Sequence, residues 1–464
     1  MVRGTRFVAP LLTLALVAAA CSSDRTSDGS GGVADPTAVN EAGLPTTFGT
    51  IEWPCRPSEA TADDDAVRGV SGDTITIGVG DDRGLASNPG LNKELTDAVL
   101  AMVDRCNELG GIAGRTVEAE VYDAAIFNIA AVMTEACGEV FMLVGQGFAL
   151  DDQGEEIRLD CDLASVPGFT VSAAAAHAPL MRQSAPNPAD QHNVVQGVQL
   201  AELFPDAIDR TANVVGNFGA ATQTGDKVQA AFETVGFEFT TELLYNILGE
   251  EDWTPFILDL KRQDIEAVHF VGSCDGYQQL RQAGVNNGYE AVWFTQPNFY
   301  SDVCTELNTD GALDGTYIFM SYTPVEEADV NDAVADFAEV LAAAGVEPSL
   351  LGMQASASFL LWATAADRCG RDLTTQCVLD EIDRIDEWTA GGLHAPTTPR
   401  NNETSSCGVL LVIDGQAFER VLPTERGSFQ CDDDYRVAID TDAARAARLD
   451  ENRISTLYSI DTSA

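Results

Sequence analysis

TITIGVGDDRGLASNPGLNKELTDAVLAMVDRCNELGGIAGRTVEAEVY, residues 74–122, carries the plainest structural pattern in the chain. An apolar run at 74–79 leads into an amphipathic helical pattern at 93–109, which Gly110 and Gly111 end, and a second apolar run follows at 116–122. Short apolar runs that alternate with amphipathic helices are typical of βαβ units, whose strands form a parallel sheet. The stretch therefore predicts an α/β fold with a central, mostly parallel sheet.

The same alternation continues outward and then begins a second time. It extends to a helix at 129–137 and a strand at 140–144, and it starts afresh after Pro186-Asn187-Pro188. The second unit is predicted to contain helices at 194–203, 225–235, 253–262 and 276–283 and strands at 212–216, 238–245, 267–271 and 291–295. Later helices are expected at 334–344 and 354–367, and a hairpin at 408–422 that turns at Asp414-Gly415. Two similar α/β units in 464 residues predict two lobes.

Residues 1–21 have the pattern of a secretory signal that ends in a lipid-attachment site. Arg3 and Arg6 precede an apolar stretch at 7–20, and Ala18-Ala19-Ala20 leads directly into Cys21. This stretch is shorter than the ~20 residues that a membrane-spanning helix needs, so cleavage before Cys21 and acylation of its thiol are expected. Residues 22–71 are rich in Ser, Gly, Asp, Thr and Pro and are predicted to be a flexible tether. The chain is thus expected to be exported and held at the extracytoplasmic face of the cell membrane by its lipid alone.

Ten cysteines remain beyond Cys21, and an even number in an exported chain indicates five disulfides. Proximity in the sequence or in the predicted sheet favours three pairs: Cys369–Cys377, Cys407–Cys431 and Cys274–Cys304. The other four cysteines leave their connectivity open, with the preferred pairs Cys55–Cys106 and Cys137–Cys161. No pair has the C-x2-C spacing of a structural zinc site, so no metal is expected.

The charge balance argues against nucleic acid as a partner. The chain has 73 acidic side chains against 26 lysines and arginines, a net charge of −47, whereas phosphate binding needs a basic patch. Motifs of common enzymes are absent as well, since the four histidines form no H-E-x-x-H pair and no G-x-S-x-G elbow occurs. Gly78, Gly80 and Gly84 lack the spacing of a dinucleotide-binding loop, and Asp81 and Asp82 would repel a pyrophosphate. The sequence therefore predicts neither an enzyme nor a cofactor.

Ligands of open parallel sheets bind outside the carboxyl ends of the strands, where loops and helix N-termini gather. In the first unit these ends are residues 81–83, 146–149 and 172–175, and in the second unit they are residues 217–218, 273–276 and 296–300. Two such rims that face each other predict a cleft for a small solute.

Several short stretches, taken in their order and spacing, resemble one known family. They are NELGGIAGR at 107–115, VYD at 121–123, MRQSAPN at 181–187, DW at 252–253 and LRQAG at 280–284. In these the chain is similar to type 1 periplasmic binding proteins of the leucine/isoleucine/valine-binding class, which serve ABC transporters. The likeness covers roughly residues 72–423.

The resemblance implies two Rossmann-like lobes joined by three crossover hinges. It places the N-lobe at 72–185 and 316–400, the C-lobe at 186–315 and 401–440, and a C-terminal tail at 441–464. It further implies that hinge closure traps a small solute without chemistry, that the partner is an ABC permease in the membrane, and that the protein is a monomer. A receptor module of the same fold that is read by a sensor, and an exported enzyme, are the alternatives.

The positions that hold an α-amino acid in this class carry other residue types here. The resemblance places a serine near Ala149, a threonine near Ala175 or Ala176, tyrosines near Thr224 and Ser273, and a carboxylate near Asn298. A charged carboxylate and ammonium buried without partners cost several kcal/mol, so a small polar ligand held through neutral groups is expected instead. Arg83 or Asp275 could add one charge contact, and aromatic walls are expected from Phe148, Phe218, Phe299 and Tyr300. The expected ligand-binding residues are Arg83, Gln146, Phe148, Ser172, Ala173, Asn217, Phe218, Ser273, Asp275, Gln296, Asn298 and Tyr300.

Overall fold

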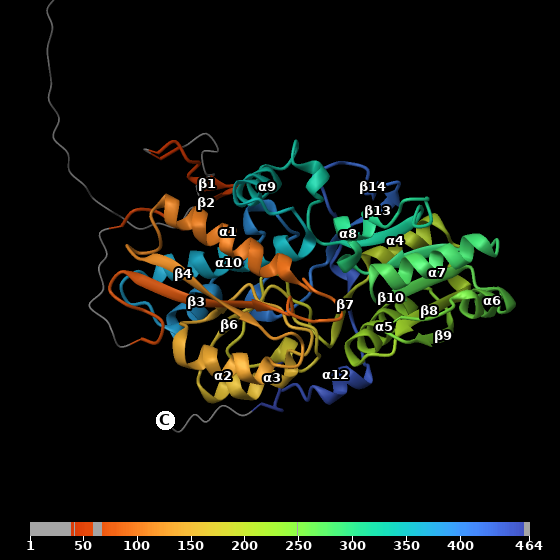
Figure 1. The fold of residues 1–464 in the computed structure, drawn as a ribbon, viewed down its shortest axis with the longest axis horizontal. Coiled ribbons are helices and arrows are strands. Elements are labelled where there is room, and N and C mark those ends of the chain that lie inside the picture. The colour runs from red at the N-terminus through yellow and green to blue at the C-terminus, as the bar shows by residue number, and fades with distance from the viewer. Residues whose placement is uncertain (1–38, 41, 59–66, 248, 459–464) are drawn as a thin grey trace, which may run out of the picture. The chain divides into compact units, whose positions relative to one another are not determined.

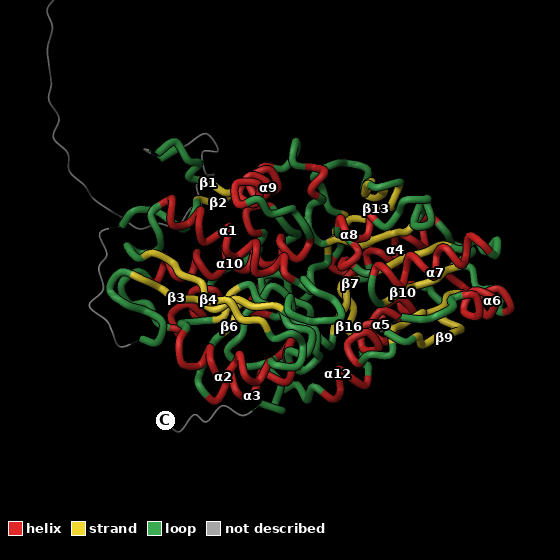
Figure 2. The backbone as a smooth tube through the Cα atoms, in the orientation of Figure 1, coloured by secondary structure: helices red, strands yellow, loops and turns green. Residues whose placement is uncertain are grey.

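The structure is a computed structural model that describes residues 39–40, 42–58, 67–247 and 249–458. Two sheets organise this part of the chain. The expected signal segment and Cys21 lie outside these residues. The region between the first sheet and the second consists mostly of loops (Figure 2). It also contains the short strands β7 (Gln191–Asn193) and β16 (Arg436–Ala438).

The first sheet is parallel and has the order β4-β3-β5-β6. Its strands are β3 (Thr74–Asp81), β4 (Thr116–Asp123), β5 (Leu143–Val144) and β6 (Ser165–Val166). One face is covered by α1 (Lys93–Leu109) and α10 (Leu350–Cys369), against which α9 (Asp332–Ala344) and α11 (Thr375–Ile382) pack. The other face is covered by α2 (Ile129–Glu139) and α3 (Asp152–Asp160) (Figure 1).

Helix α1 shows how the sequence sets these elements. Its apolar face, which includes Leu95, Val99 and Met102, is buried against α10 and the sheet. It ends where Gly110 takes a left-handed backbone with φ 119°, which a residue without Cβ adopts at little cost. The predicted bounds 93–109 are those of the helix.

The second sheet has the order β14-β13-β12-β11-β10-β8-β9, with the short β15 (Gln430–Cys431) paired to β13. Five strands are parallel: β8 (Thr211–Gly216), β9 (Phe239–Tyr245), β10 (Ala267–Val271), β11 (Val292–Thr295) and β12 (Thr316–Met320). The hairpin of β13 (Cys407–Asp414) and β14 (Ala417–Leu422) adds antiparallel strands. The helices of this unit are α4 (Val195–Leu203), α5 (Gly219–Phe232), α6 (Thr254–Arg262), α7 (Cys274–Asn286) and α8 (Asp302–Glu306).

Central strands of this sheet are buried on both faces. Every residue of β8 and β10 is buried, including the polar Asn213 and His269, as expected for central strands of a parallel sheet that is covered on both faces. The α/β class with parallel central sheets that the sequence predicts is confirmed.

Strand β12 corrects one expected lobe boundary. The resemblance places the return to the N-lobe at residue 316, but β12 pairs with β11 and with β13. The chain therefore leaves the second sheet only after Met320. An apolar strand reads the same in either sheet, so its sequence did not reveal which sheet it joins.

The expectation of a flexible tether at 22–71 is wrong for its described second half. A small hairpin of β1 (Thr47–Phe48) and β2 (Ile51–Glu52) packs against α9. Phe48 and Trp53 are buried edge to face with ring centroids 5.5 Å apart, and the backbone N–H of Gly49 donates to Asp336 Oδ2 at 2.7 Å. Two buried aromatic side chains outweigh the polar composition of the segment.

Five disulfides are present, and they are the five pairs favoured from the sequence: Cys55–Cys106, Cys137–Cys161, Cys274–Cys304, Cys369–Cys377 and Cys407–Cys431. The first ties the N-terminal hairpin to α1, and the last joins β13 to β15.

The C-terminal residues fold back onto the segment that leads out of the first sheet. Helix α12 (Asp442–Ala446) follows β16, which pairs with β7. Farther on, the backbone N–H of Ser455 donates to the His177 carbonyl at 2.8 Å. Arg453 forms two hydrogen bonds with Asp190, at 2.9 and 2.5 Å. The C-terminal segment therefore contacts residues on both sides of the first crossover between the sheets.

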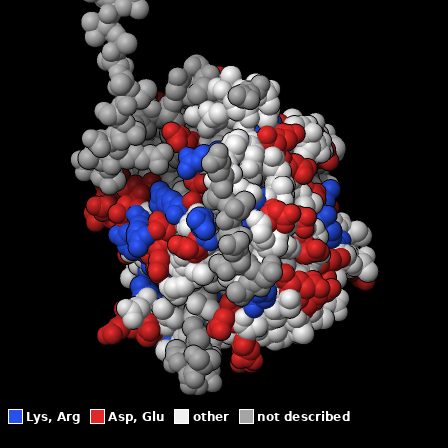
Figure 3. All heavy atoms as spheres, turned by 90° about the vertical axis from the view of Figure 1, so that its left-hand side faces the viewer, with Lys and Arg blue, Asp and Glu red and all other residues white. Residues whose placement is uncertain are grey.

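Acidic side chains are scattered over the face in Figure 3, with small groups of basic ones between them. Among the described helices, none is both long and apolar enough to cross a bilayer.

Candidate functional site

A buried carboxylate joins three loops at the carboxyl ends of the first sheet. Asp82, which follows β3, accepts hydrogen bonds from the backbone N–H of Ile126 at 2.6 Å and of Ala149 at 2.8 Å. These two residues lie in the loops after β4 and β5. Burial raises the pKa of Asp82, and the nearby Asp81 and Asp123 add to the rise. The three loop ends are thus fixed to one another.

A second carboxylate fixes the next loop of this rim. Asp151 accepts hydrogen bonds from the backbone N–H of Val171 at 2.7 Å and of Ser172 at 3.1 Å. Burial raises the pKa of Asp151 to about 7, although these hydrogen bonds oppose the rise. The loop after β6 is therefore held by the residue that directly precedes α3.

The loop after β4 bends sharply. Ala125 and Ile126 both have positive φ, 42° and 67°, which is unusual for alanine and more so for a β-branched residue. The bend leaves the next side chain, Phe127, 76% exposed. The hydrogen bond from Ile126 to Asp82 holds the bend in place.

Arg83, expected to offer a charge to the ligand, is occupied within the first lobe. Its guanidinium contacts Asp81 Oδ2 at 2.7 Å and Asp97 Oδ1 at 2.9 Å. Hydrogen bonds to Asp81 raise the pKa of Arg83 well above its ordinary value. Two carboxylates therefore already neutralise this charge.

The other expected residues of the first rim are buried or bonded to the backbone. Gln146 is 6% exposed and donates from Nε2 to Ser165 Oγ at 2.6 Å, while its Oε1 is buried without a hydrogen-bond partner among the described residues. Phe148 is buried against the backbone of Gly80. The Ser172 hydroxyl accepts from the backbone N–H of Ala175 at 3.3 Å.

Three expected residues of the second rim take part in local backbone bonds. Asn217 accepts from the backbone N–H of Ile247 at 3.1 Å, and Ser273 caps α7 by accepting from Gly276 at 3.3 Å. Asn298 donates weakly to the Gly272 carbonyl at 3.4 Å. All three side chains belong to exposed residues. They remain accessible from solvent at the ends of β8, β10 and β11.

Of the remaining residues on this rim, Phe218 is half-buried and Asp275, in the first turn of α7, is exposed. Tyr300 is buried instead, because its hydroxyl donates to Glu326 Oε2 at 2.6 Å and accepts from the backbone N–H of Val325 at 2.7 Å. Tyr300 therefore acts as a structural link at this end of the sheet.

Gln296 lies at the end of a buried polar contact. Its Nε2 is 2.9 Å from Nε2 of His269, whose Nδ1 is 2.7 Å from Asn213 Oδ1. Burial lowers the pKa of His269 to about 3, so its imidazole is neutral at physiological pH.

Helix α5, which packs on the second sheet, reaches the loops at the carboxyl ends of the first sheet. The backbone N–H of Ala173 donates to Gln223 Oε1 at 3.4 Å. On the same helix, Lys227 Nζ donates to Asn187 Oδ1 at 2.7 Å and to the Pro188 carbonyl at 2.6 Å, and burial lowers its pKa to about 7. The structure thus brings α5 together with the loop after β6 and with the first crossover.

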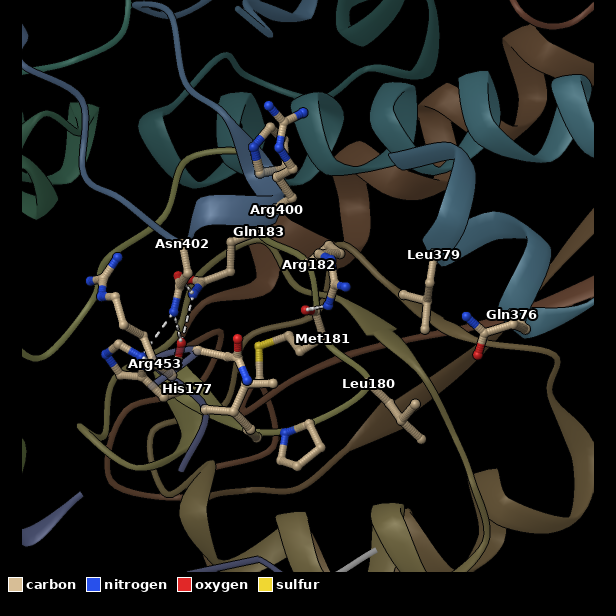
Figure 4. Close-up of a pocket in the computed structure, with 16 residues that line it drawn as sticks. His177, Leu180, Met181, Arg182, Gln183, Gln376, Leu379, Arg400, Asn402 and Arg453 are labelled. Atoms are coloured by element: carbon tan, nitrogen blue, oxygen red, sulfur yellow. Dashed lines mark hydrogen bonds between the residues drawn. The ribbon is translucent and has the colours of Figure 1, made fainter. Parts of the chain in front are cut away.

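A cavity of about 370 Å³ lies elsewhere, where the segment at 176–183 meets α11 and the C-terminal segment. It is lined by residues 176–183, by Gln376 and Leu379 of α11, by Pro399, Arg400 and Asn402, and by residues 452–454 (Figure 4). Arg182, Arg400 and Arg453 lie on its wall, and each is paired with an aspartate outside the lining. Figure 4 shows hydrogen bonds gathered around His177, Gln183 and Asn402. None of the expected ligand-binding residues lines this cavity.

The sequence missed the residues that hold the rims, namely Asp82, Asp151 and Gln223. Asp82 carried a usable signal, since an aspartate directly after an apolar strand of a parallel sheet stands at the ligand-binding edge. Gln223 carried none, because its contact is with a residue 50 positions away. Within the described residues, no group of three or more His, Cys, Asp or Glu side chains could hold a metal ion.

The structure thus contains two α/β units, each with parallel strands whose carboxyl ends carry polar side chains. Residues 195–417 match the model of the periplasmic binding protein family. The chain accordingly has the fold of type 1 periplasmic binding proteins, and the family whose model it matches is one of binding proteins. No curated protein matches the sequence.

Solved structures are similar in fold at low sequence identity. A leucine-, isoleucine-, valine-, threonine- and alanine-binding protein from Brucella ovis shares 15% identity and covers 75% of this chain and 94% of its own, with a TM-score of 0.63. A fatty acid ABC transporter substrate-binding protein from Thermomonospora curvata shares 17% identity and covers 84% and 98%, with a TM-score of 0.62. A solute-binding protein from Rhodopseudomonas palustris in complex with p-hydroxybenzoic acid shares 14% identity and covers 76% and 98%, with a TM-score of 0.63.

Proposed function

We propose that this chain is the extracytoplasmic solute-binding lipoprotein of an ABC importer, which holds a small polar solute between two lobes. The N-lobe consists of residues 72–185 and 321–400, and the C-lobe consists of residues 186–320 and 401–440. The observation that carries the proposal is that loops at the carboxyl ends of the first sheet contact α5 of the second unit, through Ala173 and Gln223. Ligands of parallel sheets bind at these edges.

Binding proceeds by a shift in population in this proposal. An open form admits the solute, and the closed form, in which both rims contact it, is the one that docks on the permease. The rims are suited to this task because Asp82 and Asp151 fix each loop of the N-lobe to its neighbours. Closure then requires movement only at the crossovers.

The proposed contacts are uncharged. Ser273 and Asn298 are accessible on the C-lobe, and Ser172 and Ala173 on the N-lobe. Arg83 is neutralised by Asp81 and Asp97, so it does not act as the partner of a ligand carboxylate. The relatives named above are described as binding amino acids, fatty acids and an aromatic acid, and the solute proposed here is a further small molecule of polar, neutral character.

Calorimetry against amino acids, amides, ureas and aromatic acids tests solute binding, together with native mass spectrometry of the purified protein for a retained ligand. Asn298→Ala should weaken solute binding about tenfold. The control is Asn286→Ala, which should not change solute binding, because Asn286 is exposed and lies in the same lobe at the far end of α7. Tight binding of leucine, or scattering profiles that are identical with and without a bound solute, would contradict the proposal.

Anchoring and import need separate tests. Cys21→Ser should release the protein from the membrane fraction without changing its affinity for solute. If cells take up the solute and lose this uptake when the gene is deleted, the protein serves an importer. Binding without uptake indicates a sensing receptor of the same fold.

A further inference from the structure

Gln296 is the last member of a chain of hydrogen-bonded side chains that crosses the C-lobe. This series of hydrogen bonds begins at Glu233, whose Oε1 accepts from Gln229 Nε2 at 2.9 Å. Gln229 Oε1 accepts from Asn213 Nδ2 at 3.3 Å. His269 then bridges Asn213 Oδ1, at 2.7 Å, and Gln296 Nε2, at 2.9 Å. Asn213 and His269 are fully buried.

The order of donors and acceptors along this series is fixed at the end that is far from Gln296. A carboxylate such as Glu233 can only accept, so the Gln229 amide must turn its Nε2 toward it and its Oε1 toward Asn213. Asn213 Nδ2 also donates to the Gly225 carbonyl at 3.4 Å, and a backbone carbonyl likewise only accepts. Two independent acceptors therefore turn Asn213 Oδ1 toward His269.

This order determines the tautomer of the histidine. Since Asn213 Oδ1 accepts, His269 carries its proton on Nδ1, and its Nε2 is left as an acceptor. Gln296 must then present its NH2 group to His269. Its Oε1, which has no hydrogen-bond partner among the described residues, is left at the end of β11 as an acceptor of fixed orientation.

We infer that Gln296 requires a hydrogen-bond donor, an N–H or O–H group, on the bound solute, and that it selects carboxamides, ureas and related neutral donors over carboxylates. The inference rests on the proposed function, because it places Gln296 at the solute. A carboxylate against Oε1 would bring two acceptors together, and the amide cannot rotate to avoid this without breaking its bond to His269.

The N-lobe rim offers a second acceptor of the same kind. Gln146 Oε1 is buried at the end of β5 without a partner among the described residues, although Gln146 Nε2 is bonded to Ser165 Oγ. An unpaired buried acceptor is costly, and a donor group on the solute would satisfy it. Acceptors on both lobes fit a solute that donates from both sides, as a urea or a primary amide does.

Nitrogen NMR of His269 in the ligand-free protein tests the chain itself. The Nδ1-protonated tautomer is expected in the wild type. In Gln296→Glu, whose carboxylate can only accept, Nε2 should become protonated. A wild-type histidine protonated on Nε2 would overturn the inference whatever the ligand is.

Calorimetry with matched pairs, benzamide against benzoate and isovaleramide against isovalerate, tests the ligand class. The amide of a pair should bind at least tenfold more tightly than the acid, and Gln296→Met should remove about tenfold of the amide's affinity. Gln263→Met, a surface change in the same lobe, is the control. Equal binding of acid and amide, or an unchanged amide affinity in Gln296→Met, would overturn the inference while leaving solute binding intact. Failure of every solute to bind would instead overturn the proposed function, and the donor requirement with it.

Discussion

Replacing the carboxyl group of Asp151 by the neutral amide of asparagine should change how stability depends on pH. Burial raises the pKa of Asp151 to about 7, and the negative charge of Glu155 adds to the rise. Between about pH 4 and about pH 7 the folded state therefore holds this proton while the unfolded chain has lost it. Because the folded state binds the extra proton, the free energy of unfolding falls as the pH rises through this window and is constant above it.

The size of the effect follows from the shift. One unit of pKa corresponds to about 1.4 kcal/mol, so a rise from 3.8 to about 7 makes the ionised carboxylate cost about 4 kcal/mol above neutral pH. Asparagine at this position does not ionise, and its single acceptor keeps one of the two bonds to Val171 and Ser172, at a loss of about 1 kcal/mol. Asp151→Asn should therefore be about 1 kcal/mol less stable than the wild type near pH 4 and about 3 kcal/mol more stable near pH 8.

Urea unfolding at intervals across this range measures the difference directly. Asp152→Asn is the matched control, because Asp152 is the next residue, begins α3 and is exposed. Its curve should run parallel to that of the wild type within about 0.5 kcal/mol. A constant offset between Asp151→Asn and the wild type at every pH would refute the reasoning, since it would show that Asp151 keeps its charge in the folded protein throughout.

Two further predictions concern the first sheet and the segments that pack on it. Loss of the Cys55–Cys106 disulfide, with a sequence separation of 51, should lower the free energy of unfolding by about 4 kcal/mol, against about 2 to 3 kcal/mol for Cys369–Cys377 with a separation of 8. Equal losses in urea titrations of the two double alanine variants would speak against loop entropy as the cause. Gly80→Ala should cost about 1 to 3 kcal/mol, because its Cβ would stand 2.6 Å from the ring of Phe148. Gly138→Ala, on the open side of α2, should instead stabilise the protein by about 0.5 to 1 kcal/mol, and thermal melts that ranked the two glycine variants the other way would contradict this packing.

The elements that the sequence predicted well are those with their own periodic pattern. Helix α1 begins and ends at the predicted residues because an apolar face and a terminal Gly110 are both local signals. Helix α5 begins at Gly219, six residues before the predicted start at 225. Its first turns are small and polar and carry few apolar residues to mark the period. Packing against β8 and β10, rather than propensity, determines where that helix begins.

The N-terminal hairpin and the C-terminal segment escaped prediction for a different reason. Each is held by a few specific contacts instead of a repeating pattern: Phe48 on Trp53 and a disulfide in the first, and Arg453 on Asp190 in the second. Contacts of this kind join particular residues, as Arg453 and Asp190 do across 263 positions, so composition indicates a tether or a tail where the structure has an ordered segment. The paired cysteines were the one local sign that residues near Cys55 are fixed to the fold.

The site was harder to predict than the fold because its chemistry is determined by partners and not by residue types. Arg83 and Gln296 were both reasonable candidates from their place after a strand. The structure neutralises Arg83 with two carboxylates from its own lobe, whereas it fixes Gln296 through His269, 27 residues earlier in the chain. The charge of Arg83 is thereby paired, and the amide of Gln296 is held in one orientation. Which of two polar residues at a rim can recognise a solute therefore depends on the hydrogen bonds behind it, and these bonds exist only once the sheet has formed.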